Sequence, residues 1–278
     1  MAFKTVLSVV ETRASENDLK LAVDLCQREN SHLAIQLITI AIPPPESPSA
    51  PMSDTAWVEA YRNLTDQLNQ RVNTINTLFA QTGVSGDIAT EYLDKGSVDE
   101  AVGIRARCAD IAVIGPELMA NDSLKSSVLR GLFYIAQIPV LLVPKGKSAT
   151  FHPKTVLLAW DGGLEASRAA HEALPLLLNA GKVHITMVTP DDSTEKRTME
   201  PGADLAAYLA RHGVNAIVDR LPRDGRRVAE VLQAHAADIS ADLIVIGAYS
   251  HSRLRDLIFG GVTRTMLSDA RLPVFMAR

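Results

Sequence analysis

Short apolar runs alternate with helical patterns along the first half of the chain. The runs are rich in β-branched residues, whereas the helical patterns carry apolar residues every three or four positions. The runs cover residues 5–10, 33–40, 111–114 and 140–143, and the helical patterns cover residues 17–28 and 98–108. This alternation predicts βαβ units, in which helices cover a parallel sheet.

The middle of this half is interrupted by prolines at positions 43–45, 48 and 51. After them, apolar residues recur at helical spacing between positions 55 and 80. They are Trp57, Tyr61, Leu64, Leu68, Val72, Ile75 and Phe79. The pattern predicts a proline-rich surface excursion followed by one long amphipathic helix.

The chain also repeats itself. The sequence KTVL at 4–7 returns at 154–157, an offset of 150, and DIAVIG at 110–115 matches DLIVIG at 242–247, an offset of 132. The difference, 150 − 132 = 18 residues, is accounted for by the proline-rich excursion of the first copy. We therefore predict two tandem domains, 1–145 and 152–278, joined by a short polar linker. Each is expected to be a doubly wound, Rossmann-like α/β domain with a five-stranded parallel sheet, whose strand order reverses between strands one and four.

The last strand of each copy is an apolar sheet edge. Residues 140–143 and 274–277 would be a liability if they were left exposed. We expect them to pair with each other across a pseudo-twofold axis, so that one chain imitates a dimer of single domains. A homodimer of two chains through other faces stays open.

The segment after strand four of the second copy, residues 245–264, carries the richest candidate chemistry. Gly247 ends a strand, and Gly260 and Gly261 precede a helical pattern. Glycines in these places let backbone N–H groups approach an anion at a helix N-terminus. Further candidate donors in the same segment are Thr263, His251, Arg253 and Arg264.

The glycine spacing of this segment resembles the signature of the universal stress protein family, which is Gly, two residues, Gly, nine residues, Gly, then Ser or Thr. Gly247, Ser250, Gly260 and Gly261 stand at its four positions. Ser250 replaces a glycine of the nucleotide-binding branch, and Gly261 replaces a hydroxyl residue, with Thr263 following two positions later. Because the opening strand, the strand-four glycine and the closing Pro-Val strand match twice, the chain resembles a tandem member of this family, with the fold of adenine nucleotide alpha hydrolases.

The resemblance implies that the second copy binds ATP or another adenine nucleotide, with the presence of Mg²⁺ left open. Asp161, at the end of the first strand of that copy, would contact the ribose or the base, and Val188 would line the adenine pocket. The segments 247–250 and 260–263 would surround the ribose and the phosphates. The residues implied to bind the nucleotide are Ala159, Trp160, Asp161, Val188, Ile246, Gly247, Ser250, His251, Arg253, Gly260, Gly261, Val262 and Thr263.

The equivalent loop of the first copy is two residues shorter. Ser126 and Ser127 replace the glycine pair, and Glu117 and Asp122 add negative charge. Because acidic residues oppose an anion and side chains hinder the approach of the backbone, the first copy is predicted to have a degenerate site. Glu11 takes the place of the strand-one aspartate.

Composition narrows the remaining function classes. The formal net charge of -4 gives no attraction toward the phosphates of nucleic acid. The N-terminus lacks a leader pattern, and no run of about 18 apolar residues occurs. Cys26 and Cys108 are interpreted as buried apolar residues in a reducing compartment. We expect a cytoplasmic protein with neither nucleic acid nor membrane as a partner.

Patterns for catalysis and metal binding are missing from the sequence. It contains no GxSxG, P-loop or paired-carboxylate motif, and its histidines lack HxxxH spacing, so that no metal site is predicted. The leading hypothesis is a stress-response or regulatory module that acts on an unknown regulatory protein partner. Two alternatives stay open: a structural or interaction module that binds no nucleotide, and an enzyme with weak ATP hydrolysis or self-phosphorylation.

Overall fold

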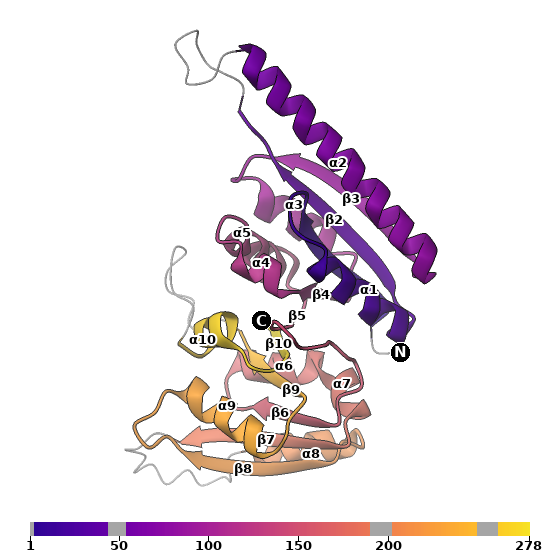
Figure 1. Cartoon of the computed structure of the whole chain (residues 1–278). Helices are drawn as coiled ribbons and strands as arrows, with labels where there is room; N and C mark the ends of the chain where they lie inside the picture. Colours follow the sequence, from indigo (N-terminus) through magenta and orange to yellow (C-terminus); the bar gives the residue numbers. More distant parts are fainter. Residues whose placement is uncertain (1–2, 44–53, 190–201, 249–260) are drawn as a thin grey trace. The chain divides into compact units, whose positions relative to one another are not determined.

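The computed structural model describes residues 3–43, 54–189, 202–248 and 261–278 (Figure 1). Its contacts divide the chain into two units. The N-terminal unit is Lys4–Ala136, and the C-terminal unit is Gln137–Arg278 together with Met1–Phe3.

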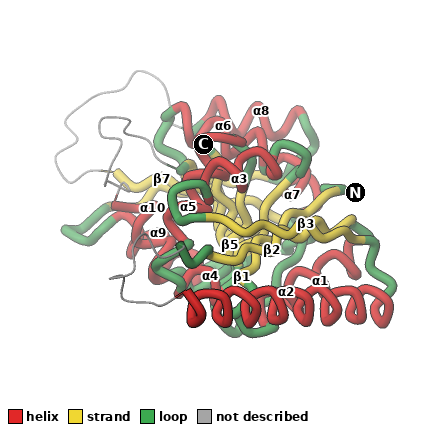
Figure 2. Tube along the Cα trace, turned by 90° about the horizontal axis from the view of Figure 1, so that it is seen from above, coloured by secondary structure: helices red, strands yellow, loops and turns green. Residues whose placement is uncertain are grey.

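The N-terminal unit is an α/β domain built on parallel strands. Its elements are β1 (Thr5–Glu11), α1 (Asn17–Glu29), β2 (His32–Ile40), α2 (Asp54–Thr82), β3 (Gly86–Leu93), α3 (Val98–Ala106), β4 (Ile111–Ile114), α4 (Pro116–Ala120), α5 (Lys125–Arg130) and the π-helix η1 (Gly131–Ala136). The strand order is β3-β2-β1-β4, and β1 pairs in parallel with both β2 and β4. In Figure 2, α1 and α2 run along one side of these strands and α3 lies on the other.

The C-terminal unit repeats this plan. Its elements are β5 (Val140–Leu142), β6 (Thr155–Ala159), α6 (Leu164–Glu172), α7 (Leu174–Asn179), β7 (Lys182–Thr189), α8 (Ala203–Arg211), β8 (Ala216–Pro222), α9 (Val228–Asp238), β9 (Leu243–Gly247), α10 (Gly261–Asp269) and β10 (Val274–Ala277). The strand order is β5-β10-β9-β6-β7-β8, and only the pairing of β5 with β10 is antiparallel among these neighbours.

The predicted fold class is confirmed, including the pairing of the two closing strands. β6, the first strand of the second copy, lies between β7 and β9, so the strand order reverses between strands one and four. Val140 of β5 lies opposite Met276 of β10, and Leu142 lies opposite Val274. This pairing places β5 in the C-terminal unit, although the first repeat encodes it. The boundaries 1–145 and 152–278 follow the sequence repeat and stay a prediction.

The predicted amphipathic helix is α2, which begins and ends within two residues of the predicted range. Its buried positions are Leu64, Arg71 and Ile75, spaced seven and four residues apart as on one face of a helix. The guanidinium group of Arg71 donates a hydrogen bond to the carbonyl oxygen of Ser15 at 2.6 Å, so the polar end of this buried side chain has an acceptor.

A carboxylate at the start of strand four holds strand one in each repeat. Asp110 accepts hydrogen bonds from the amides of Lys4 and Thr5 at 2.7 and 2.9 Å. Asp242 accepts from the amides of Lys154 and Thr155 at 2.8 and 3.0 Å. The KTVL and DxxVIG segments that reveal the duplication are therefore joined in space by the same contact.

Two expectations drawn from composition can be compared with the structure. Cys26 is buried. The pKa of its thiol is raised to about 12, mainly because burial disfavours the charged thiolate and to a smaller extent because Glu29 is negatively charged. The prediction for Cys108 is wrong, because α3 ends at Ala106 and leaves Cys108 exposed in the turn that follows. Among the described residues, no helix combines the length and the hydropathy needed to cross a bilayer.

The strand-one contact leads to a prediction about stability. Asp242→Ala should lower the free energy of unfolding by about 1–2 kcal/mol, because two backbone amides lose an ionised acceptor at a solvent-exposed position. Asp238→Ala, at an exposed position of α9, is the matched control and should change it by less than about 0.5 kcal/mol. Urea unfolding followed by circular dichroism measures both. Equal unfolding curves for the two variants would contradict the role given to Asp242.

Candidate functional site

A cavity of about 320 Å³ lies at the carboxyl ends of β6, β7 and β9 in the C-terminal unit, beside the first turn of α10. Because β6 pairs with β7 on one side and with β9 on the other, the strand order reverses here. Ligands of open α/β sheets bind in the crevice at such a reversal. The position of the cavity thus follows from the strand order.

Nine of the residues singled out in the sequence lie together around this cavity. They are Ala159, Trp160, Asp161, Val188, Ile246, Gly247, Gly261, Val262 and Thr263. They come from the ends of three strands and from the start of α10, and are separated by up to about a hundred positions in the chain. Ser250, His251, Arg253 and Gly260 lie outside the described residues.

Five further lining residues were missed by the sequence analysis. They are Glu165 and Ala166 of α6, Thr186 of β7, and Val228 and Leu232 of α9. Thr186 precedes Val188 by two positions, so strand periodicity alone places both on one face of β7. Val228 and Leu232 are four positions apart on one face of a helix, but only the tertiary structure shows that this face is turned toward β7.

The mouth of the cavity is organised by the turn after β6. The Oδ1 atom of Asp161 accepts a hydrogen bond from the amide of Gly163 at 2.7 Å, across Gly162 with its left-handed φ of 77°. The amide of Trp160 donates to the carbonyl oxygen of Thr186 at 2.9 Å, which ties the end of β6 to β7. Asp161 is exposed and is held by the turn at the edge of the hollow.

Gly247 is required by the close approach of α6. A Cβ atom there would lie 2.5 Å from the carbonyl carbon of Glu165 and 2.6 Å from the amide nitrogen of Ala166. Both are backbone atoms, which cannot rotate away. The missing side chain of Gly247 therefore lets α6 form one wall of the cavity.

The first turn of α10 forms another wall. A Cβ atom added at Gly261 would meet no atom of the described residues within 4 Å, and the Gly261 backbone lines the cavity. Thr263 is only 4 % exposed and also lines the hollow. The N–H groups of a helix's first turn have no partner within the helix and carry partial positive charge, which favours an anion.

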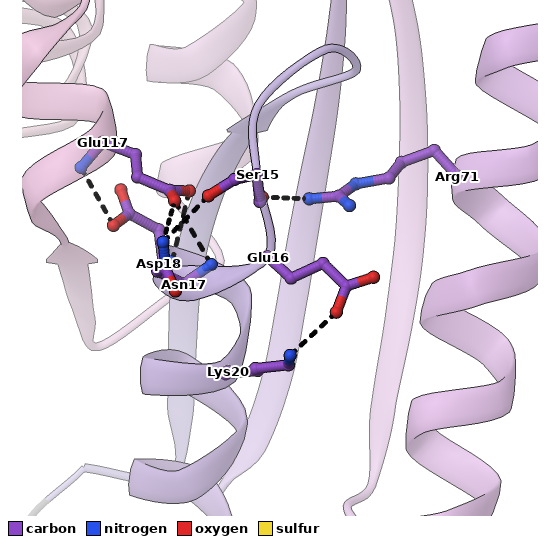
Figure 3. Close-up of polar contacts among 7 residues, drawn as sticks. All are labelled: Ser15, Glu16, Asn17, Asp18, Lys20, Arg71 and Glu117. Atoms are coloured by element: carbon purple, nitrogen blue, oxygen red, sulfur yellow. Dashed lines mark hydrogen bonds and ion pairs between the residues drawn. The ribbon is translucent and has the colours of Figure 1, made fainter.

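The equivalent loop of the N-terminal unit is occupied by its own carboxylates (Figure 3). Asp18 accepts hydrogen bonds from the amides of Glu117 and Leu118 at 3.0 and 2.9 Å, at the start of α4. The Oε1 atom of Glu117 in turn accepts from the side-chain amide of Asn17 at 2.6 Å and from its backbone amide at 3.3 Å, at the start of α1. The two helix N-termini are thus capped reciprocally by side chains of the same unit.

This internal capping uses the groups that an anion would need. Burial raises the pKa of Asp18, against the lowering effect of the Leu118 and Glu117 amides. A Cβ atom at Gly115, the counterpart of Gly247, would lie 2.2 Å from the Oδ1 atom of Asp18. Glu11 accepts a hydrogen bond from the side-chain amide of Asn121 in the loop after α4. The strand-one acid of this repeat therefore already has a partner within the protein.

The fold and the cavity define a class of proteins, namely tandem doubly wound α/β domains with a hollow at the strand-order reversal of the second. The model of the universal stress protein family matches residues 152–278. The universal stress protein in QAH/OAS sulfhydrylase 3'region of Thermus aquaticus is 31% identical over 137 residues, which cover 45% of this chain and 98% of that protein. The chain belongs to the universal stress protein family.

Two further comparisons extend this assignment. The stress response protein NhaX of Bacillus subtilis (strain 168) is 34% identical over 84 residues, covering 30% of this chain and 49% of NhaX, so the chain matches about half the length of that relative. The solved structure of a universal stress protein from Archaeoglobus fulgidus DSM 4304 has a TM-score of 0.71 at 15% identity and covers 100% of this chain and 97% of its own. A putative universal stress protein from Pseudomonas aeruginosa UCBPP-PA14 has a TM-score of 0.54 at 16% identity, covering 99% and 93%. These two structures share the tandem fold.

The wall contact of Gly247 gives a prediction. Gly247→Ala should lower the free energy of unfolding by about 1–3 kcal/mol, because the new methyl group forces the α6 backbone away from the strand end. Gly261→Ala is the control, since no atom of the described residues lies within 4 Å of its methyl group and alanine favours the helix. Urea unfolding of the full chain measures both. A Gly247→Ala variant as stable as the wild type would show that α6 does not approach so closely.

Proposed function

We propose that the C-terminal unit binds an adenine nucleotide, ATP or a relative of it. The protein would then be a stress-response or regulatory module whose conformation or affinity for a partner depends on that nucleotide. The observation that carries the proposal is that one cavity gathers the nine described residues which the family resemblance assigns to the nucleotide.

The size and the walls of the cavity suit a base. Its volume of about 320 Å³ falls within the range of small-molecule sites, which is about 300–1,000 Å³. Val188, Leu232 and Ile246 supply apolar surface for the faces of an adenine ring. Thr186, on the same strand face as Val188, adds a hydroxyl group that can hydrogen-bond to a ring nitrogen or an exocyclic amine.

The charged residues that line the cavity favour one orientation of the nucleotide. Asp161 and Glu165 stand on the β6 and α6 side, where they favour sugar hydroxyl groups and oppose phosphates. A carboxylate has about four acceptor positions, and the Gly163 amide uses one of those on Asp161. The ribose is therefore assigned to Asp161 and the phosphates to the first turn of α10, where the backbone N–H groups favour negative charge.

A magnesium ion is compatible with the same side of the cavity. Asp161 and Glu165 offer the carboxylate oxygens that Mg²⁺ prefers, and an ion held there would offset their repulsion of the nucleotide phosphates. Titrations with Mg²⁺ and with EDTA separate a metal-dependent nucleotide site from a metal-independent one.

The N-terminal unit is proposed not to bind a nucleotide. The amides at the start of α4 already donate to Asp18, and Glu117 adds a second carboxylate beside them. A phosphate would have to displace the first carboxylate and overcome the repulsion of the other. This predicts one nucleotide per chain.

Calorimetric titration of the full chain with ATP, ADP and cyclic AMP tests the proposal. One equivalent is expected, with a rise in the melting temperature on adding the nucleotide. Asp161→Ala should weaken binding by about tenfold, the loss of roughly one charge-assisted hydrogen bond. Glu11→Ala, the same change at the equivalent position of the first repeat, should leave the affinity unchanged.

Three outcomes would contradict the proposal in different ways. No heat and no shift in melting temperature at millimolar nucleotide would favour the structural or interaction module. Two equivalents per chain would contradict the degenerate first site. Phosphate release that exceeds the spontaneous rate and is lost in Val188→Trp, a change that fills the cavity, would favour the weak ATPase. Cytoplasmic location, a homodimer and a regulatory protein partner stay predictions.

A further inference from the structure

A second cluster of polar side chains lies in the C-terminal unit outside the lining of the cavity. The Nδ1 atom of His184 and the Nε2 atom of His235 both lie 2.7 Å from the Oδ2 atom of Asp219. The three ligand-type atoms lie within 4.8 Å of one another. The two imidazole rings have centroids 6.2 Å apart and are inclined at 77°, so that both point edge-on at the same oxygen.

The fold brings these residues together from three elements. His184 is on β7 and Asp219 is on the edge strand β8. Asp219 lies opposite Thr186 of β7, and Thr186 shares a strand face with His184 because the two are two positions apart. His235 follows Leu232 by three positions on α9, so both project from one face of that helix. Since α9 packs on β7, this helix face meets that strand face. The two histidines are 235 − 184 = 51 positions apart in the chain, which explains why a search for HxxxH spacing misses the cluster.

The cluster is partly enclosed but accessible to small solutes. The side chains of His184, Asp219 and His235 are 13%, 21% and 16% exposed. Groups this polar are costly to remove from water unless they are bound to one another or to an ion. The elements that carry them are regular strands and a helix, so the three side chains start from fixed backbone positions.

We propose that His184, Asp219 and His235 bind one divalent transition-metal ion of the zinc type, with water as the fourth ligand. Two imidazole nitrogens and one carboxylate oxygen are a ligand set that zinc accepts, and three protein ligands leave one position of a tetrahedron open. The absence of sulfur from the set disfavours soft ions such as Cu(I). This inference concerns a site separate from the nucleotide cavity and does not depend on the proposed function.

The ion would replace the hydrogen bonds of the cluster. In a tetrahedral site with bonds of about 2.0–2.1 Å, neighbouring ligand atoms lie roughly 3.3 Å apart. The nitrogens must therefore move away from the oxygen by about half an ångström each, and the two nitrogens, now within 4.8 Å of each other, must take up the same spacing. Each neutral ring then carries its hydrogen on the nitrogen that faces away from the metal, so no proton is lost overall. A protonated ring has to release one proton, and binding should weaken in acid.

A bound ion would fasten α9 to β7 and β8. Val228 and Leu232, on the same face of α9 as His235, line the cavity, while Thr186 and Val188 continue the His184 face of β7. Two residues along a strand span about 6.6 Å, so the cluster lies roughly one side-chain layer from the cavity floor. The metal is therefore assigned a structural role, which holds a cavity wall against the sheet.

Titration of the chelator-treated full chain with Zn²⁺, and with Co²⁺ as a spectroscopic probe, tests the site. One Zn²⁺ per chain is expected, together with the visible absorption bands of four-coordinate Co²⁺ and a higher melting temperature. His184→Ala and Asp219→Asn should each lower the Zn²⁺ affinity by at least about tenfold. His212→Ala, which removes a histidine of the same unit outside the cluster, is the control and should bind as the wild type does.

Either of two results would overturn the proposal. Wild-type protein that binds no Zn²⁺ would reduce the cluster to a hydrogen-bonded triad. Binding of equal strength in wild type and in His184→Ala would place the ion on other histidines. If His184→Ala fails to fold by circular dichroism, Asp219→Asn, which keeps the side-chain shape, and the wild-type titration still decide.

Discussion

The two-sided parallel pairing of β6 is the constraint on which the candidate site depends. Because β7 and β9 flank it, the strand order reverses at β6, and ligands bind outside the carboxyl ends of the strands at such a point. The walls of the hollow combine apolar side chains such as Val188, Leu232 and Ile246 with the carboxylates of Asp161 and Glu165 on the side of β6 and α6. Gly247 sets the depth of the hollow by letting the α6 backbone reach the end of β9.

The two repeats share the interactions that build the sheet and differ in those that surround the strand ends. Asp110 and Asp242 hold strand one to strand four in the same way, with nearly equal distances to the two amides. At the opposite end of the strands, Asp18 and Glu117 cap each other's helices in the N-terminal unit, whereas the C-terminal unit leaves a cavity. A duplicated domain can thus keep its stabilising contacts while the surroundings of its strand ends diverge between the two copies.

Sheet edges are treated differently at the two sides of the C-terminal unit. β10 is covered by the antiparallel β5, so its apolar residues meet apolar partners. β8, at the other side, carries Asp219 facing two histidines and exposes Ile217 two positions earlier on the same strand. A polar cluster on an edge strand reduces the tendency of that edge to pair with another chain. It also supplies the ligand atoms on which the proposed metal site depends.

The sequence by itself determined the duplication, the doubly wound fold, the pairing of the closing strands and the long helix α2, because these follow from periodicities and repeats that are local or that recur at a fixed offset. The family resemblance also pointed to Asp161, Val188, Gly247 and Thr263, which line one cavity in the structure, while their role in binding stays a prediction. Only the tertiary structure decided the exposure of Cys108, the contribution of α9 to the cavity and the meeting of His184, Asp219 and His235. These three features depend on where a helix ends and on which of its faces packs against a strand. Packing between segments that are distant in the sequence sets both properties, so no single segment carries a pattern that reveals them.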